Sequence, residues 1–284
     1  MQKLFDKTPE SVVYFLAGSL PAEALLHLRQ LSLFCMICLI PDNILNRIAR
    51  YILITAKENS TSWFVSISKL CLLYGLPHPL TLLNNPIPKI SSKKMIKTKV
   101  LEYWQTKLRL SSSKLDSLIY FKPEFMSLSR VHPIWSTCGN NSYEVTMAIV
   151  QVRFLSGRYR CEKLTSHFST GSSSQCSICD DKSIGSIEHI LTSCSALHET
   201  RSQHLNALST NMKMSNKSKN LIKSYMSSNE NMTVQFLLDA SVLPDIITAV
   251  QSENIDILDE IFGFTRSWCY AMHRKRLQLQ GNYH

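Results

Sequence analysis

Glycine is scarce in this chain, with 8 glycines among 284 residues. Phosphate-binding loops of the Gly-rich kind need several glycines so that backbone N–H groups can approach the ligand. The sequence contains no Gly-x-x-x-x-Gly-Lys-Ser/Thr loop, no Gly-x-Ser-x-Gly turn and no His-Glu-x-x-His pair. These absences argue against a glycine-built nucleotide site and against the common hydrolase motifs. We therefore expect a protein that is not an enzyme.

Long apolar runs are also missing. The longest, Leu31–Ile40, covers ten residues between Gln30 and Pro41, about half of the roughly 20 that a membrane-spanning helix needs. The first residues carry charges where a signal peptide would become apolar. The nine cysteines form no regular disulfide framework. We expect no membrane span and an intracellular protein whose thiols stay reduced and free to bind metal.

Acidic residues are too few to balance the basic ones, and the net charge is +10. The excess is concentrated: residues 89–168 carry 14 basic and 5 acidic residues, whereas residues 1–88 carry 7 and 5, residues 169–206 carry 2 and 4, and residues 207–284 carry 8 and 7. Such clustering is typical of a surface that binds a polyanion. These boundaries also define four expected regions: N-terminal helical, basic helical, metal-binding, and a polar linker followed by a C-terminal helix.

The first basic cluster falls on an expected helix from Ser91 to Leu110. Its apolar residues recur every four positions and predict one buried face: Ile96, Val100, Trp104 and Leu108. Its lysines are candidates for contacts to nucleic-acid phosphates: Lys93, Lys94, Lys97 and Lys99. The alternative is an ordinary solvated helix face.

The second basic cluster lies in the segment from Ala148 to Leu164, which is expected to be helical around a turn at Gly157. Three arginines, Arg153, Arg158 and Arg160, flank that glycine and Tyr159. Arginines beside an aromatic residue suit both phosphate binding and base stacking. Tyr159 is alternatively a core residue, on the apolar side of the segment with Ile149, Val152 and Leu155.

The most specific pattern in the sequence is a set of four soft metal ligands within 19 residues: Cys176, Cys179, His189 and Cys194. Two cysteines separated by two residues can turn both thiolates toward one ion, and three thiolates with one imidazole fill a tetrahedral zinc site. No position is left for water or substrate, so the pattern indicates one structural zinc. His198 is an alternative ligand, and chelation is expected to unravel residues 174–200.

The remaining sequence predicts a mainly α-helical scaffold, with the metal-binding region 169–206 as one small zinc-stabilised insert. Helices are expected over Ala22–Leu39, Ile44–Ala56 and Ser62–Tyr74, the second of them capped by Asp42-Asn43. A second Cys-x-x-Cys pair, Cys35 and Cys38, lies in an apolar run and is assigned to the core.

Two further elements are expected toward the end of the chain. Residues 209–232 are polar and are expected to be a linker or a long loop. An amphipathic helix closes the chain, with apolar residues at Ile255, Leu258, Phe262, Thr265, Cys269 and Met272. The basic residues from His273 to Arg276 complement its dipole or, alternatively, form another nucleic-acid contact. The apolar stripe of this helix packs either on its own chain or on a second copy of the chain, and the sequence does not distinguish these two alternatives.

Much of the chain resembles the region downstream of the polymerase domain in non-LTR, LINE-type retrotransposon proteins. The segments that carry the resemblance are LLHLRQLSLFCMICLI, CLLYGLPHPLTLLNNP, YEVTMAIVQVRFLSGRYRCEKL, CSICDDKSIGSIEHILTSCSALHETR, FLLDASVLPDIITAVQ and RSWCYAMHRKRLQL. In that family a Cys-Cys-His-Cys zinc knuckle is regarded as helping to bind element RNA or DNA. The resemblance implies RNA or DNA as partner, an associated reverse transcriptase polypeptide, and a nuclear or cytoplasmic ribonucleoprotein.

The paired aspartates of a reverse transcriptase active site are absent, because the sole Asp-Asp pair, Asp180-Asp181, lies between the expected metal ligands. The expected function is therefore non-catalytic binding of nucleic acid by a retrotransposon-related fragment. Two alternatives stay open: a module that docks on a polymerase or on itself, and a remnant without function.

Overall fold

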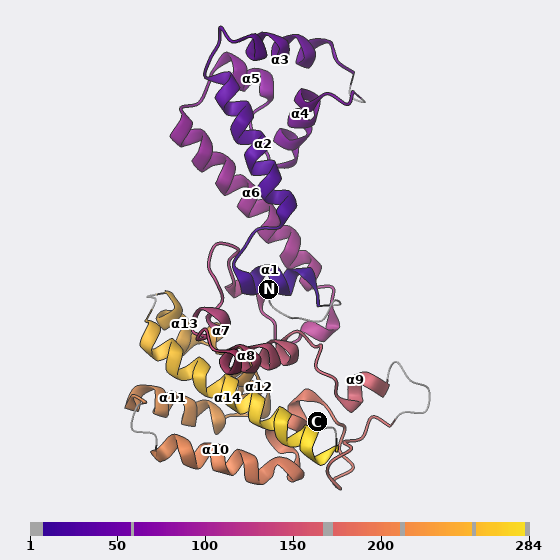
Figure 1. The fold of residues 1–284 in the computed structure, drawn as a ribbon, viewed down its shortest axis with the longest axis vertical. Helices are drawn as coiled ribbons and strands as arrows, with labels where there is room; N and C mark the ends of the chain where they lie inside the picture. The colour runs from indigo at the N-terminus through magenta and orange to yellow at the C-terminus, as the bar shows by residue number, and fades with distance from the viewer. Residues whose placement is uncertain (1–7, 58–59, 167–172, 211–213, 252–253, 282–284) are drawn as a thin grey trace. The chain divides into compact units, whose positions relative to one another are not determined.

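The computed structural model describes residues 8–57, 60–166, 173–210, 214–251 and 254–281, and within them the chain is mainly α-helical, as the sequence predicts (Figure 1). In these ranges the sole β-type pairing is an isolated antiparallel bridge between Gln175 and Ile184. The chain divides into a smaller unit, Gly18–Ser111, and a larger unit formed by Met1–Ala17 and Ser112–His284. The basic region 89–168 is thus divided between the two units.

The smaller unit contains helices α2 (Ala22–Cys38), α3 (Ile44–Thr55), α4 (Trp63–Leu73), α5 (Pro79–Asn84) and most of α6 (Lys89–Ser112). Side-chain caps help set these boundaries: the Asn43 side chain accepts a hydrogen bond from the Leu45 N–H at the start of α3. The four apolar residues that predicted the buried face of α6 are each at most 5% exposed. Cys35 and Cys38 are buried in α2, which confirms their assignment to the core.

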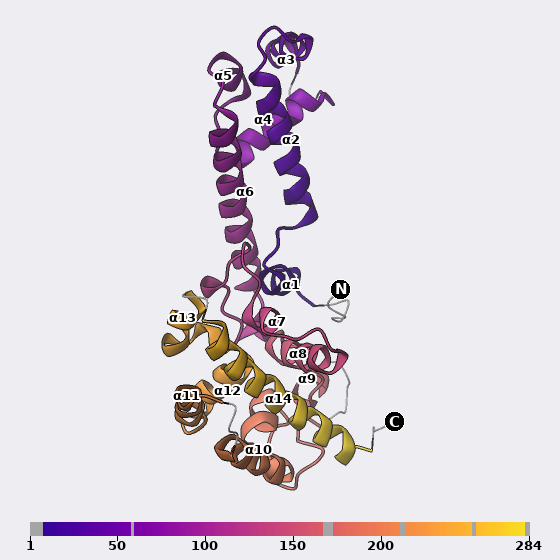
Figure 2. The same cartoon turned by 60° about the vertical axis from the view of Figure 1, so that its left-hand side comes forward.

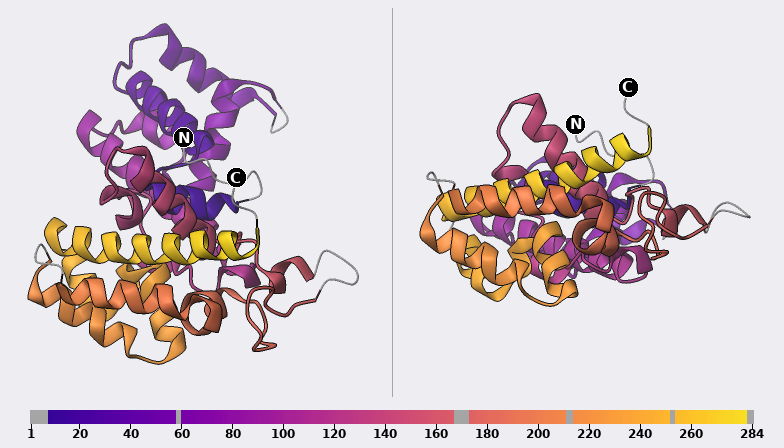
Figure 3. Two further views of the ribbon diagram at one scale, coloured as in Figure 1. Left: turned by 60° about the horizontal axis from the view of Figure 1, so that its bottom comes forward. Right: turned by 90° about the horizontal axis from the view of Figure 1, so that it is seen from below.

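The larger unit contains α1 (Glu10–Ala17), α7 (Pro133–Ser136), α8 (Ser142–Leu155), α9 (Glu162–Ser166), α10 (His198–Thr210), α11 (Asn216–Met226), α12 (Glu230–Leu238), α13 (Pro244–Gln251) and α14 (Ile255–Leu279). Helix α14 is its centre: α8, α10, α11 and α12 all contact it, as Figures 2 and 3 show. Gln151 of α8 connects three helices, because its amide donates to the Leu237 carbonyl of α12 and to Thr265 Oγ1 of α14. The unit is built around this buried helix.

The apolar stripe of the C-terminal helix packs on its own chain. Five of the six predicted positions are buried in α14, and the exception, Ile255 at the first residue, is 64% exposed. The helix continues to Leu279, three residues beyond the basic run that was expected to close it. Arg276 also turns inward and is 5% exposed, so its role is not confined to complementing the helix dipole.

Two local expectations were wrong. The polar stretch 209–232 contains helix α11, whose Ser218, Ile222 and Tyr225 are buried; residues 211–213 lie outside the described residues. Most of its Asn, Lys and Ser residues are exposed, Ser218 excepted. Three buried residues in about three turns, one of them a serine, were too few to reveal the helix by composition. The apolar residues of segment 148–164 also do not share one helix, because α8 ends at Leu155 and the chain turns at the expected Gly157, so Tyr159 lies beyond the helix.

Candidate metal centre and basic pocket

The structure brings the four predicted metal ligands together. The ligand atoms of Cys176, Cys179, His189 and Cys194 all lie within 4.8 Å of one another. The Sγ atoms of Cys176 and Cys194 are 4.0 Å apart, and Cys179 Sγ is 3.3 Å from His189 Nε2. Around a tetrahedral zinc, bonds of about 2.3 Å to sulfur and about 2.0 Å to nitrogen separate two sulfurs by about 3.8 Å and a sulfur from a nitrogen by about 3.5 Å. The group therefore has the dimensions of a metal site.

The first two ligands are presented by a tight loop. The Cys176 N–H donates to the Ser183 carbonyl and the Gly185 N–H donates to the Ser174 carbonyl, each over 2.8 Å. These bonds flank the Gln175–Ile184 bridge and close the loop like a short hairpin. Lys182, where the loop turns back, has a φ of 54° and so adopts a left-handed conformation.

The last two ligands belong to a segment packed into the core of the larger unit. His189 begins a short π-helical turn, η3 (His189–Ser193), and Ile190, Leu191 and Leu197 are fully buried. Trp268 Nε1 of α14 donates to the Leu191 carbonyl over 3.2 Å. The expected small, separately stabilised knuckle over 169–206 is therefore not confirmed. Only the loop side of the site projects from the helices that hold it.

The surroundings of His189 and Cys194 suit metal binding. His189 Nδ1 lies 3.3 Å from Ser193 Oγ, which leaves Nε2 directed at Cys179, the arrangement in which a second hydrogen bond orients a ligating imidazole. Burial lowers the pKa of His189, so its neutral, ligating form is favoured. Burial and the neighbouring Cys176 and Cys179 raise the pKa of Cys194 to about 12. A bound cation would offset the free-energy cost of deprotonating these thiols, because it stabilises the thiolates.

The alternative ligand and the paired aspartates lie outside this group. His198 is exposed at the start of α10, with Nε2 3.5 Å from Ser202 Oγ. Asp181 is exposed, and its carboxylate accepts a hydrogen bond from the Ser195 N–H over 3.4 Å. Through this contact Asp181 stabilises the backbone at Ser195.

A helix-ending motif places the second basic cluster next to the metal loop. At the end of α8 the Arg158 N–H donates to the Arg153 carbonyl and the Gly157 N–H donates to the Phe154 carbonyl, the pair of bonds that defines a Schellman motif. Gly157 has a φ of 63°, and a Cβ there would lie 2.3 Å from the Ser117 carbonyl oxygen. Glycine is thus required at this position for both reasons.

Beyond this turn lies a cavity of about 460 Å³ between the segment 153–165, Ser177 of the metal loop and the last turns of α14. All three predicted arginines line it, together with two basic residues that the sequence analysis assigned to the helix end: Arg153, Arg158, Arg160, His273 and Arg276. Tyr159 also lines the cavity but is 4% exposed. Its ring stacks on Phe154 with centroids 3.7 Å apart, which confirms Tyr159 as a core residue.

Glu162 connects the cavity to the metal loop. Its Oε1 accepts hydrogen bonds from Ser177 Oγ in the Cys-x-x-Cys loop and from Arg276 over 2.9 Å. Arg276 also donates to the Arg160 carbonyl over 2.8 Å. Burial disfavours the charged form of Glu162, but the bonds from Ser177 and Arg276 outweigh it and lower the pKa of this carboxyl. The sequence analysis missed Glu162 and Arg276; Arg276 extends the buried stripe four residues beyond Met272.

The lysine cluster belongs to the smaller unit. Lys93, Lys94, Lys97 and Lys99 are exposed on α6, in the smaller unit, and Lys99 pairs with Glu102 over 3.1 Å. The structure therefore brings the predicted arginines together in one cavity but places the predicted lysines on a different unit.

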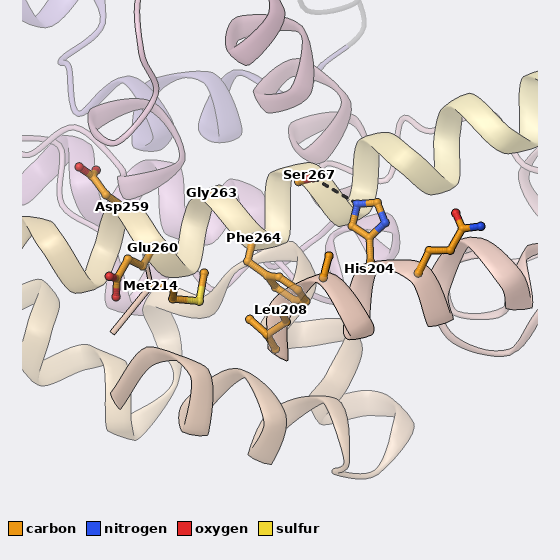
Figure 4. A pocket seen from close by; sticks show the side chains of 10 residues that line it. His204, Leu208, Met214, Asp259, Glu260, Gly263, Phe264 and Ser267 are labelled. Atoms are coloured by element: carbon orange, nitrogen blue, oxygen red, sulfur yellow. Dashed lines mark hydrogen bonds between the residues drawn. The ribbon is translucent and has the colours of Figure 1, made fainter. Parts of the chain in front are cut away.

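Another cavity, of about 670 Å³, lies between α10 and α14 (Figure 4). His204 faces Ser267 there, with 3.2 Å between Nε2 and Oγ, and its Nδ1 lies 3.3 Å from the Thr200 carbonyl. Both ring nitrogens are thus engaged, and Figure 4 shows Asp259 and Glu260 away from the imidazole. No catalytic constellation is assembled among the described residues of this cavity.

A buried His-Asp-Ser cluster was not predicted by the sequence. His132 Nε2 lies 3.1 Å from Ser241 Oγ and 3.2 Å from Asp239 Oδ1, while its Nδ1 accepts from the Ile134 N–H. A catalytic triad needs Asp and Ser on opposite ring nitrogens. Here both lie on Nε2, which must carry the proton, so the imidazole cannot accept one from Ser241. The cluster ties α7 to the segment before α13.

No known protein family, curated protein or solved structure matches this chain. Within the described residues no single helix is long and apolar enough to cross a membrane, and just α1 and α2 taken as a broken pair reach the needed length and composition.

Proposed function

We propose that this protein binds nucleic acid without catalysing a reaction, and that Cys176, Cys179, His189 and Cys194 hold one structural zinc. Three thiolates and an imidazole suit zinc among the common biological cations, and they leave no coordination position for a substrate. The observation that carries the proposal is the contact between the metal loop and the arginine-lined cavity through Ser177 and Glu162. In this arrangement the metal would fix one wall of a basic surface.

The proposal also includes the relationship of this chain to the post-polymerase region of non-LTR retrotransposon proteins, with RNA or DNA as the partner. The net charge supports a polyanion as ligand, and both basic clusters contribute exposed or cavity-lining cations. A polymerase would have to be supplied by another polypeptide or another part of a longer chain.

Salt dependence tests the binding function. The affinity of the full chain for a labelled single-stranded RNA should fall as salt rises from 50 to 200 mM, with a log-log slope of about −0.7 for each phosphate contacted. Four to seven contacts correspond to a loss of about 50- to 900-fold. Neutralising Lys93, Lys94, Lys97 and Lys99 together should reduce the slope by about 3 if all four contact phosphate. Absence of saturable binding at 50 mM salt would refute the function.

A second candidate, a protein-interaction module, is favoured by apolar side chains exposed on the smaller unit. On α2 and α3 these include Leu25, Leu26, Leu33, Ile44, Tyr51 and Ile54, each at least 48% exposed. Apolar docking changes little with salt, whereas phosphate binding weakens steeply. Salt-insensitive association with a reverse transcriptase polypeptide, or with a second copy of the chain, would therefore favour this function over nucleic-acid binding.

A further inference from the structure

Basic side chains surround the cavity beside the metal loop on several sides. Arg153 comes from the last turn of α8, Arg158 and Arg160 from the turn that follows, and Arg276 from the last turn of α14. Glu162 is the one carboxylate among the lining residues. Four guanidinium groups therefore face one carboxylate, and the cavity carries a net positive charge of about three.

His273 does not add to that charge at neutral pH. Burial and the adjacent Arg153 and Arg276 lower its pKa to about 4. Its Nδ1 lies 3.1 Å from the hydroxyl oxygen of Tyr159. Burial and Arg160 also lower the pKa of Arg153. For Arg276, burial is outweighed by Tyr159 and Glu162, which instead raise its pKa. Part of the cost of charging Arg153 is thus repulsion from Arg160, and an anion placed beside these two arginines would relieve it.

Tyr159 leaves no open ring face on which a base could stack beside a bound anion. One face of that ring is covered by Phe154, and the Arg276 guanidinium lies 5.4 Å from its centroid. Most of the other polar groups in the lining are guanidinium N–H donors, whose planar fork matches the oxygens of phosphate; Thr165, Ser177 and Gln280 add two hydroxyls and an amide. The Nε of Arg158 is buried and has no hydrogen-bond partner among the described residues. The lining therefore offers donors for an oxyanion and few means of reading a base.

We propose that this cavity is a phosphate-binding site, lined by Arg153, Arg158, Arg160 and Arg276, that takes a phosphate group of a nucleic-acid strand. That the phosphate belongs to a nucleic acid rests on the proposed function. That the cavity binds a phosphate group rests on its lining residues alone. A volume of about 460 Å³ exceeds what a bare phosphate fills and leaves room for the attached sugar. Because phosphate contacts carry no sequence information, binding here is independent of base sequence.

The test compares the full-length wild type with Arg158→Gln and Arg158→Lys, using inorganic phosphate as the first probe in a calorimetric titration. Arg158→Gln should weaken phosphate binding at least tenfold, because it removes a charged fork. Arg158→Lys keeps the charge but not the fork, so its loss should be smaller. Lys217→Gln is the matched control: Lys217 is exposed on α11, outside the cavity, and the same loss of charge there should leave phosphate binding unchanged.

A second arm identifies the source of the phosphate with two oligonucleotides that differ only in a 5′-phosphate or a 5′-hydroxyl. A preference for the 5′-phosphate that Arg158→Gln abolishes assigns the site to a strand end; equal binding that Arg158→Gln weakens assigns it to the backbone. Circular dichroism and metal content verify that each variant is folded. Phosphate binding that is absent, or unchanged in folded Arg158→Gln, would overturn the site even if RNA still binds. Phosphate binding without RNA binding would instead overturn the proposed function.

Discussion

Removing the metal should unfold the loop that carries Cys176 and Cys179 but not the segment that carries His189 and Cys194. The loop residues 174–186 have few buried side chains, and two backbone hydrogen bonds beside the Gln175–Ile184 bridge close it. Each such bond contributes about 1 kcal/mol, whereas ordering a residue costs about 1–2 kcal/mol in backbone entropy. A loop of this length therefore depends on the metal, whose apparent binding free energy in such sites is about 10 kcal/mol or more.

The second segment has its own anchors. Ile190, Leu191 and Leu197 are fully buried, and burying three such side chains contributes about 5–9 kcal/mol. The hydrogen bond from Trp268 to the Leu191 carbonyl adds about 1 kcal/mol. The loop 174–186 buries no large apolar side chain of this kind, so residues 189–200 should stay folded when the loop opens without metal. The sequence-based expectation that all of 174–200 unravels is revised accordingly.

Hydrogen exchange with mass spectrometry measures this difference directly. After chelation, peptides covering 174–186 should exchange at least about 100-fold faster, and peptides covering 189–200 should change by less than about tenfold. The double variant Cys176→Ser/Cys179→Ser should show the fast loop before chelator is added and no further change afterwards. Equal acceleration in both segments would refute the anchoring argument, and no acceleration in either would refute a structural role for the metal.

Three further predictions concern the arginine turn and α14. Gly157→Ala should destabilise the protein by about 2–4 kcal/mol in urea unfolding, because it adds a left-handed alanine and a backbone clash; Gly263→Ala, with open space at its Cβ, should not. The stability of the wild type should fall as the pH drops from 6.5 to about 4, because in this range the unfolded chain protonates His273 and the folded protein does not. His273→Gln should remove up to about 3 kcal/mol of that loss. A pH profile that the substitution leaves unchanged would contradict the lowered pKa of His273. Glu162→Ala should lower the free energy of unfolding by about 3 kcal/mol, because it leaves buried Arg276 without its carboxylate partner. In an Arg276→Met background the same substitution should lower it much less. Additive effects of the two substitutions would show that the ion pair contributes little.

The sequence predicted those elements whose signal is local. Helix α6 has a four-residue apolar period, and the residues that set it are buried, from Ile96 to Leu108. Helix α3 was placed by its cap, and the Asn43 side chain makes that cap. Helix α11 was missed because its inward residues include a serine, Ser218, which is buried but does not contribute to an apolar pattern.

The metal group was predictable because its four ligands are close in sequence and their residue types are specific. What surrounds them was not, since Trp268 contacts this segment from 77 positions away in the chain. The cavity illustrates the same limit: Arg153, Arg158 and Arg160 are brought together by a local turn, but Arg276 joins them only through the packing of α14. Periodicity places such a residue on the buried side of its helix without identifying what it contacts.

X-ray absorption at the zinc edge of the purified protein tests the proposed zinc site most directly. We predict one zinc per chain, bound by three sulfurs at about 2.3 Å and one nitrogen at about 2.0–2.1 Å. Cys194→Ser should lose one sulfur from that shell or lose the metal. A protein purified without zinc that also fails to take it up, or a zinc shell made mainly of oxygen, would contradict the assignment of Cys176, Cys179, His189 and Cys194 as a structural zinc site.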